Sequence, residues 1–200
     1  MIYLVAISLV LGILFGCFVF DHSTAAFFDA ISDKALLALV VSVGISVGAD
    51  RSVVGKLKNI RLNVLFLPLL IIIGSLLGGA AAGAMLGIDM RESLMIASGL
   101  GWYSLSGVMV GDLSGALMGT IAFLSSIMRE MFAILLVPFL AKFGNGYAAI
   151  APAAATSEDT ALSMIIKYTG KETVLAAVVN GIVCSTAVPL LIQTIYKLLG

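Results

Sequence analysis

The sequence is short of charged residues. Only 11% of its 200 residues are Asp, Glu, Lys or Arg, and the formal net charge at pH 7 is +0. A neutral chain presents no basic surface to nucleic acid, so we expect no nucleic-acid partner. No polar interval is long enough to bury a hydrophobic core of its own. The composition therefore excludes a separate soluble domain.

Histidine and cysteine, which often carry metal or redox chemistry, are also nearly absent. The single histidine, His22, lies in a connecting loop and is interpreted as an exposed loop residue rather than a proton relay. Cys17 and Cys184 lie within apolar runs, where a thiol packs as a small hydrophobic group. The chain has no G-x-x-x-x-G-K-[ST] loop for a nucleotide. We therefore expect no metal site, no cofactor and no enzymatic activity.

Apolar residues, in contrast, are abundant. They make up 61% of the chain, and the mean hydropathy is +1.17. Apolar runs of about 20 residues recur along the sequence, which is the length of a membrane-spanning helix. The sequence therefore predicts an all-α integral membrane protein, a polytopic helical bundle. Seven hydrophobic segments are expected, at about 2–20, 34–49, 62–86, 91–111, 114–142, 147–167 and 172–198.

The loops after the first and second segments predict the orientation in the membrane. The first carries Asp21, Asp29 and Asp33, whereas the second, residues 51–61, carries four basic side chains. Cytoplasmic loops are enriched in Lys and Arg, so the second loop is predicted to be cytoplasmic. The N-terminus is then cytoplasmic and the C-terminus outside, in a multi-pass protein surrounded by the lipid bilayer.

Two of the seven segments are too rich in Gly, Ser or Pro to be regular lipid-facing helices. Residues 97–115 contain five Gly and four Ser, and Pro152 precedes the polar run 156–160. These residues free backbone groups that hydrocarbon cannot hydrogen-bond, which is tolerated only inside protein or beside a watery cavity. We predict two broken or re-entrant helices that meet near the bilayer midplane and form one polar cavity. For the first segment, close helix packing through small residues is the alternative.

The second half of the chain has an internal repeat. Each broken segment is followed by a long apolar helix, and "LLVPFL" at 135–140 corresponds to "TAVPLL" at 186–191 with an offset of 51 residues. The same offset places Asn180 opposite Arg129. If both broken segments re-enter, the result is an inverted repeat with five full spans; if both cross, there are seven spans.

The repeat also suggests a division of the chain. We expect residues 1–90 to form scaffold transmembrane helices. Residues 91–200 are expected to form a transport core with two units, each a broken helix followed by a long helix.

Two full charges lie in the middle of the predicted helix 114–142. Arg129 and Glu130 are neighbours there, although a charge at the bilayer centre costs about 2.5–3.5 kcal/mol on insertion scales. Adjacent positions of a helix do not face each other, so each side chain needs a partner elsewhere. Ser125 and Ser126 lie one turn earlier and extend both polar faces. The residues predict a site for a cation and a proton, and a buried Arg–Glu network that only locks helices together is the alternative.

Three motifs resemble the LysO family of bacterial lysine exporters. They are "ASGLGWYSLSG" at 97–107, "RE" at 129–130 followed by "AILLVP", and "ATSEDTAL" at 155–162. The resemblance covers essentially the whole chain and corresponds to the C-terminal two-thirds of the longer members. It implies a secondary active transporter that exports L-lysine and toxic lysine analogues across the bacterial inner membrane. It also implies that Glu130 is the essential membrane acid and that Asp159 is the family's Asp after Thr-Ser.

The same resemblance bears on assembly. The longer members carry further residues before the part that this chain matches. We therefore expect a homodimer or a complex with a short membrane partner.

The charges of lysine indicate which side chains would bind it. Glu130, Asp159 and Glu158 offer carboxylates to its two ammonium groups. Arg129, together with N–H groups at the ends of the broken helices, offers donors to its carboxylate. The other candidates are Trp102 and Tyr103, which offer a cation–π face, and the polar residues Ser104, Ser106, Thr156 and Asn180.

Export of lysine must be coupled to another gradient. Moving a net +1 solute out of an inside-negative cell costs about 2.3 kcal/mol per 100 mV, and the chain has no nucleotide-binding loop. Proton antiport is the simplest drive, since one carboxylate at Glu130 can hold either a proton or an ammonium group, never both. The alternatives are a related transporter for another small charged solute, such as a sodium-coupled organic-anion carrier, a channel-like or structural subunit, and an intramembrane aspartyl protease.

Overall fold

The computed structural model describes residues 7, 11, 14, 15, 62–170 and 173–200. Most of the first predicted segment, all of the second and both loops that predict the orientation lie outside these residues, as do His22 and Cys17. The chain divides into two compact units, residues 1–42 and 43–200. The helices from residue 62 onward all belong to the second unit.

The described part of the second unit is all helical, which confirms the predicted fold class. Three of its helices are long and apolar enough to cross a membrane. Their bounds lie within two residues of the segments predicted at 62–86, 114–142 and 172–198. In chain order the elements are α4 (Leu62–Leu86), α5 (Met90–Ala97), α6 (Tyr103–Ser114), α7 (Ala116–Phe143), α8 (Gly146–Ile150), the 3₁₀ helix η1 (Ala154–Glu158), α9 (Leu162–Thr169) and α10 (Val174–Leu199).

Both segments rich in Gly, Ser or Pro are broken, as predicted. The first consists of α5 and α6, and the chain turns between them with positive φ angles of 48° at Leu100 and 96° at Gly101. The second consists of α8, η1 and α9, with a φ of 46° at Ala154. α5 has 8 residues and α6 has 12, whereas a helix that crosses a bilayer needs about 20. Neither half spans a membrane by itself.

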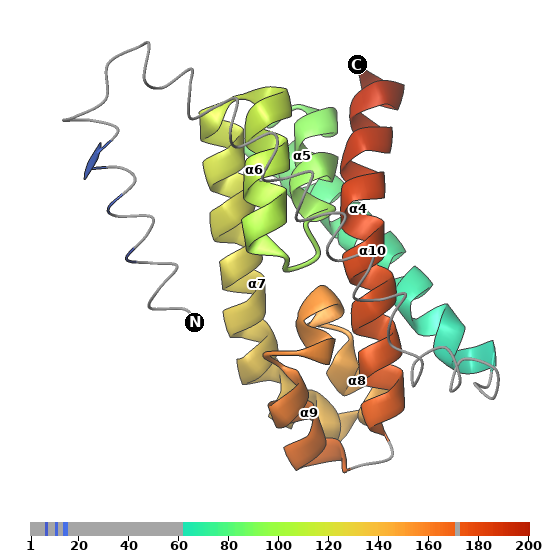
Figure 1. Ribbon diagram of the computed structural model, residues 1–200. Helices are drawn as coiled ribbons and strands as arrows, with labels where there is room; N and C mark the ends of the chain where they lie inside the picture. Colours follow the sequence, from blue (N-terminus) through green and yellow to red (C-terminus); the bar gives the residue numbers. More distant parts are fainter. Residues whose placement is uncertain (1–6, 8–10, 12–13, 16–61, 171–172) are drawn as a thin grey trace. The chain divides into compact units, whose positions relative to one another are not determined.

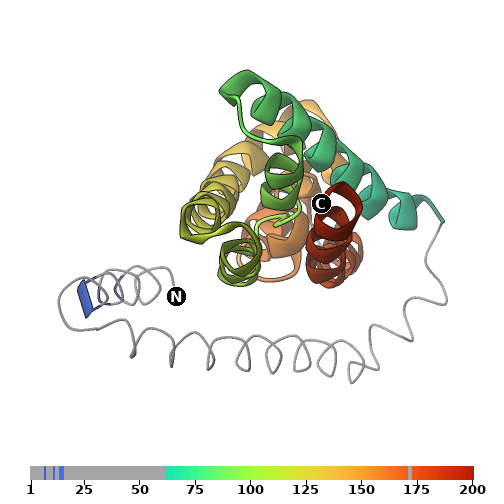
Figure 2. The ribbon, with the colours of Figure 1, turned by 90° about the horizontal axis from the view of Figure 1, so that it is seen from above.

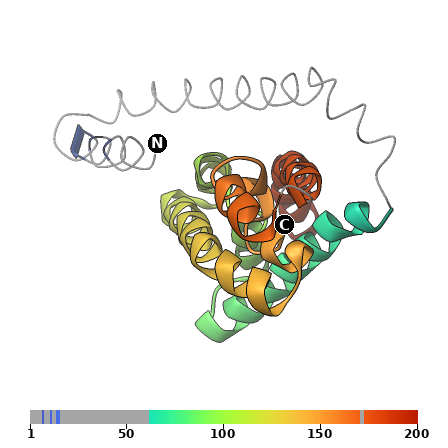
Figure 3. The same cartoon turned by 90° about the horizontal axis from the view of Figure 1, so that it is seen from below.

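The two broken segments fold back on themselves from opposite ends of the bundle (Figure 1). We call residues 90–114 hairpin 1 and residues 146–169 hairpin 2. Hairpin 1 lies beside the N-terminal half of α7, and hairpin 2 beside its C-terminal half, so that their tips face each other. Seen from above and from below, both hairpins lie between α7 and α10, while α4 crosses at an angle on one side (Figures 2 and 3). Each broken segment thus folds back as a hairpin rather than running the length of the bundle, which is the shape expected of a re-entrant segment.

Equivalent contacts recur in the two halves of the sequence repeat, hairpin 1 with α7 and hairpin 2 with α10, at the predicted offset of 51 residues. In hairpin 1, the hydroxyls of Ser106 and Ser126 on α7 are 3.2 Å apart and hydrogen-bonded. In hairpin 2, the Ser157 hydroxyl donates to the carbonyl of Ala177 on α10 over 2.8 Å. Ser157 and Ala177 follow Ser106 and Ser126 by 51 residues each. The two halves of the repeat therefore share this contact between hairpin and long helix, and both place the hairpin before the long helix in the chain.

Close packing through small residues also occurs in hairpin 1. A Cβ atom added to Gly119 of α7 would lie 2.6 Å from the Gly111 Cα and 2.7 Å from the Gly107 carbonyl oxygen of α6. Real Cβ atoms do not approach backbone this closely, so α6 and α7 can pack in this way only around a glycine. Hairpin 1 thus combines both sequence interpretations: it is broken at its tip and packed through glycines along α6.

We expect Gly119→Ala to lower the free energy of unfolding by about 1–3 kcal/mol, because the added methyl group meets backbone atoms that cannot move aside. Thermal unfolding in mild detergent measures the effect. The matched control is Gly78→Ala in α4, where an added Cβ meets nothing within 4 Å. The control is expected to be neutral or stabilising by about 0.5–1 kcal/mol. Equal melting temperatures for both variants would show that the α6–α7 contact is not this close.

Candidate functional site

The tips of the two hairpins touch through their backbones. The Ala155 N–H donates to the Leu100 carbonyl over 3.1 Å, and both residues are buried. Gly101 completes the contact, because a Cβ added there would lie 3.4 Å from the Thr156 Cγ2. The prediction that the broken segments meet is confirmed, while the location of this junction at the bilayer midplane stays a prediction.

Asn180 of α10 holds the tip of hairpin 2. Its side chain is fully buried, and its Nδ2 donates to the Ala154 carbonyl and to the Ser157 Oγ, both over 3.0 Å. The Cys184 thiol donates to the Asn180 Oδ1 over 3.7 Å. The Ala154 carbonyl, which the break leaves outside a regular helix, thus finds its hydrogen-bond donor within the protein. The contacts of Asn180 are those of a positioning residue.

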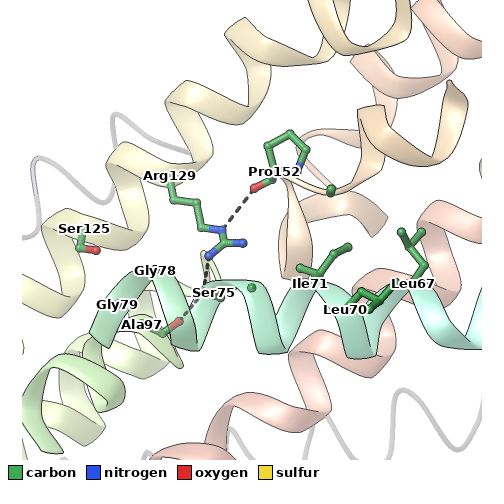
Figure 4. A pocket seen from close by; sticks show the side chains of 12 residues that line it. Leu67, Leu70, Ile71, Ser75, Gly78, Gly79, Ala97, Ser125, Arg129 and Pro152 are labelled. Carbon is green, nitrogen blue, oxygen red and sulfur yellow. Dashed lines mark hydrogen bonds between the residues drawn. The ribbon is translucent and has the colours of Figure 1, made fainter. Parts of the chain in front are cut away.

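Arg129 of α7 is hydrogen-bonded to hairpin 2 directly and to hairpin 1 through a serine of α4. Its Nε donates to the Pro152 carbonyl over 3.2 Å, and its Nη1 donates to the Ser75 Oγ of α4 over 2.7 Å (Figure 4). The Ser75 hydroxyl donates in turn to the carbonyl of Ala97, the last residue of α5, over 3.0 Å. The Ala97 carbonyl at the end of α5 and the Pro152 carbonyl in the turn after α8 have no acceptor role within a helix of their own. Arg129 donates to the Pro152 carbonyl directly, and it is linked to the Ala97 carbonyl through the Ser75 hydroxyl.

The acceptors of Arg129 are therefore neutral oxygen atoms. The sequence predicted that Arg129 would find a partner away from Glu130, and the structure agrees. Ser75 belongs to α4, which was assigned to the scaffold, and no motif in the sequence pointed to it. A single serine in a span rich in Gly and Leu is the only signal that was available.

A cavity of about 660 Å³ lies beside the Arg129 guanidinium. Its volume is in the range of small-molecule sites. It is polar at the Arg129 end and otherwise apolar, which differs from the single polar cavity predicted, because α4 supplies much of its wall. The lining residues are Leu67, Leu70, Ile71, Gly74, Ser75, Gly78, Gly79, Ala97, Ser125, Arg129, Ala151 and Pro152 (Figure 4).

Glu130 lies on a different face of α7 and is only 3% exposed. Among the described residues no group hydrogen-bonds to its Oε1 atom. Tyr103, at the start of α6, is close enough to Glu130 and to Asp159 for electrostatic interaction with both. The Tyr103 ring packs edge-on against Phe123 of α7, with the ring centroids 5.7 Å apart. The structure thus gathers Glu130, Tyr103 and Asp159 around one region.

The two acids of hairpin 2 differ in their surroundings. Glu158 is partly buried, and its Oε1 accepts a hydrogen bond from Ser185 of α10 over 3.0 Å. It packs against Gly181, where an added Cβ would lie 2.6 Å from the Glu158 Cβ. Asp159 is exposed and accepts hydrogen bonds from the backbone N–H and hydroxyl of Thr160. Ser185 and Gly181 were missed, although their spacing of four places them on one face of α10.

The remaining candidates lie around the tips. Trp102 is partly buried and directly precedes α6, and Ser104 is exposed. Ser106 is fully buried in its contact with Ser126, and the Thr156 hydroxyl donates to the Ala153 carbonyl over 2.9 Å. The hydroxyls of Ser106 and Thr156 thus already have partners within the protein.

Comparison with known proteins supplies related sequences. The family model described as "Lysine exporter LysO" matches residues 6–196. The chain is similar to the lysine exporter LysO of Escherichia coli (strain K12), with 34% identity over 190 residues, 94% of this chain and 60% of that protein. It is also similar to the putative lysine exporter of Haemophilus influenzae (strain ATCC 51907 / DSM 11121 / KW20 / Rd), with 31% identity over 159 residues, 78% of this chain and 80% of that protein. The chain thus spans less than two thirds of the length of the Escherichia coli relative, and no solved structure matches it.

Proposed function

The chain belongs to the lysine exporter LysO family, and from this we propose that it carries L-lysine and toxic lysine analogues out of the cell in exchange for protons. The site is the junction of the hairpin tips with α7 and α10, in a multi-pass protein of the bacterial inner membrane. The N-terminus is cytoplasmic and the C-terminus outside. The homodimer, or the complex with a short membrane partner, stays a prediction.

The observation that carries this proposal is the state of Glu130. Its carboxyl group is buried, and its Oε1 has no hydrogen-bond donor among the described residues. An ionised carboxylate in such a place is costly unless a cation is beside it, and a protonated one is not. Glu130 therefore suits two alternating occupants, a proton and an ammonium group. Release of one allows binding of the other, which couples the two fluxes.

The opposed hairpins support a transporter rather than a static subunit. Broken helices whose ends converge on one site are typical of secondary transporters, where the helix ends help to bind charged groups. The tips here meet through the hydrogen bond from Ala155 to Leu100 and are held by Arg129 and Asn180. A junction of this kind can change its contacts while α7 and α10 remain intact.

We expect proteoliposomes that contain the full chain to accumulate labelled L-lysine when their interior is more acidic than the medium. Protons then leave as lysine enters, and an uncoupler should abolish the accumulation. A sodium gradient at constant pH should have no effect. Flux of an organic anion that follows the sodium gradient would favour the alternative carrier, and vesicles that move lysine under neither gradient would contradict the proposal.

A further inference from the structure

We infer that the cavity beside Arg129 is the subsite for the carboxylate of the transported amino acid, and that Arg129 thereby distinguishes amino acids from amines. The inference rests on the proposed function and adds the part of the substrate that this cavity binds. It assigns separate tasks to the neighbouring charges of α7. Arg129 binds the carboxylate, and Glu130, on a different face, binds an ammonium group or a proton.

The first argument comes from the free donors of Arg129. A guanidinium group has five N–H donors. The contacts with the Pro152 carbonyl and the Ser75 Oγ use the Nε and one N–H of Nη1. Neither contact uses the third nitrogen, which lies on the side of the guanidinium toward Ile71 (Figure 4). The hydrogen bonds of Arg129 to described residues are these two, so within the described part of the chain the cavity faces a cation with further donors available.

The two existing contacts also hold the guanidinium in place. The Ser75 hydroxyl uses its proton on the Ala97 carbonyl, so its oxygen is available as an acceptor for Arg129. A guanidinium fixed at two of its nitrogens loses little further freedom when a ligand binds to the remaining ones.

The second argument is charge. No acidic residue is among those that line the cavity, and both acceptors of Arg129 are neutral. With one cation and no acid among its lining residues, the cavity favours an anionic group over a cationic one. The planar guanidinium matches a carboxylate with two parallel hydrogen bonds, which makes this pairing stronger than a contact with a neutral oxygen.

The third argument is the shape of the cavity. Its volume of about 660 Å³ accommodates a small molecule, and Leu67, Leu70 and Ile71 give it apolar walls that suit an aliphatic chain. Gly74 and Gly78 of α4 border open space, since a Cβ added at either position meets nothing within 4 Å. A carboxylate with a short aliphatic chain fits this combination of one charged end and apolar walls.

The test compares competitors that differ at the carboxylate. Labelled L-lysine flux is measured at zero membrane potential in phosphatidylcholine vesicles, so that no anionic lipid competes for Arg129. Unlabelled lysine, lysinamide and cadaverine are the competitors. With wild-type protein, lysine should compete at least about tenfold better than either amine, since only lysine offers the charged partner of a guanidinium. In Arg129→Gln the ratio should fall to near one, and in Arg129→Lys it should be intermediate.

A purely structural role of Arg129 would change the result in another way. It would weaken all three competitors equally and leave their ratio unchanged, which would overturn the inference. Wild-type protein that moves lysine but does not discriminate against lysinamide would also overturn it and leave the proposed function standing. Protein that moves no lysine would defeat both.

A second variant leaves the contacts of Arg129 in place, in case Arg129→Gln does not fold. Gly74→Leu puts a side chain into the open cavity and should raise the half-maximal lysine concentration at least about tenfold by excluding the ligand. The matched control is Ala82→Leu, at an exposed position of α4 away from the cavity lining. Unchanged lysine affinity in Gly74→Leu would show that the substrate does not enter this cavity.

Discussion

Glu130→Gln is expected to abolish lysine transport while the protein stays folded. The amide resembles the protonated acid in size and hydrogen-bonding capacity, and the Oε1 atom loses no existing partner among the described residues. The neutral side chain, however, offers no charge to an ammonium group and cannot release a proton. Removing the charged partner of a desolvated cation costs about 3–5 kcal/mol, so proton-driven lysine flux should fall more than about 100-fold.

The control for this change is Glu92→Gln, the same substitution in the first turn of α5. There the carboxylate is attracted by the positive, N-terminal end of the helix dipole, an interaction worth only about 0.3–1 kcal/mol. Transport should therefore stay close to that of the wild type. Normal transport by Glu130→Gln would mean that Glu130 only locks helices together and that the proposed exchange of proton and ammonium is wrong.

Thermal unfolding of the same preparations separates Glu130 from its neighbour. Arg129→Gln removes the donors to the Pro152 carbonyl and the Ser75 Oγ. Both acceptors are partly buried, and a buried acceptor left unsatisfied costs about 1–3 kcal/mol, which is the upper range for each of them. The free energy of unfolding should therefore fall more for Arg129→Gln than for Glu130→Gln.

Asn180→Leu is expected to lower the free energy of unfolding by about 2–4 kcal/mol and to stop transport. The leucine side chain cannot donate to the Ala154 carbonyl or the Ser157 Oγ, both of which lie in the buried tip of hairpin 2. The tip loses two of its hydrogen bonds to α10 and keeps those of Ser157 with Ala177 and of Glu158 with Ser185, so it holds the two acids of hairpin 2 less firmly. Thermal unfolding in detergent and pH-driven lysine flux measure the two effects.

The matched control for Asn180 is Thr186→Val, an equally apolar replacement on α10. The Thr186 hydroxyl is exposed and only donates to the carbonyl of Ile182 one turn earlier, over 2.8 Å. Its loss should change the free energy of unfolding by less than about 0.5 kcal/mol. If both variants melted like the wild type, Asn180 would not be holding the tip.

The sequence by itself determined the features that depend on local composition. Apolar runs of sufficient length predicted the all-helical class and the three long helices, because a helix satisfies its backbone within one segment. Gly, Ser and Pro predicted both breaks, and the match between 135–140 and 186–191 predicted the repeat offset. Arg129 and Glu130 stand out in any apolar segment, since burying charge is costly wherever the helix lies.

Only the tertiary structure decided how these parts meet. It showed that each broken segment folds into a hairpin. It also showed that Ser75 is a partner of Arg129 and that Glu158, rather than Asp159, contacts α10, and both contacts join residues far apart in the chain. The cavity beside Arg129 likewise depends on distant residues, because α4 supplies much of its wall. Local sequence sets which backbone and side-chain groups must be satisfied, but the three-dimensional packing of the helices decides which distant group satisfies each of them.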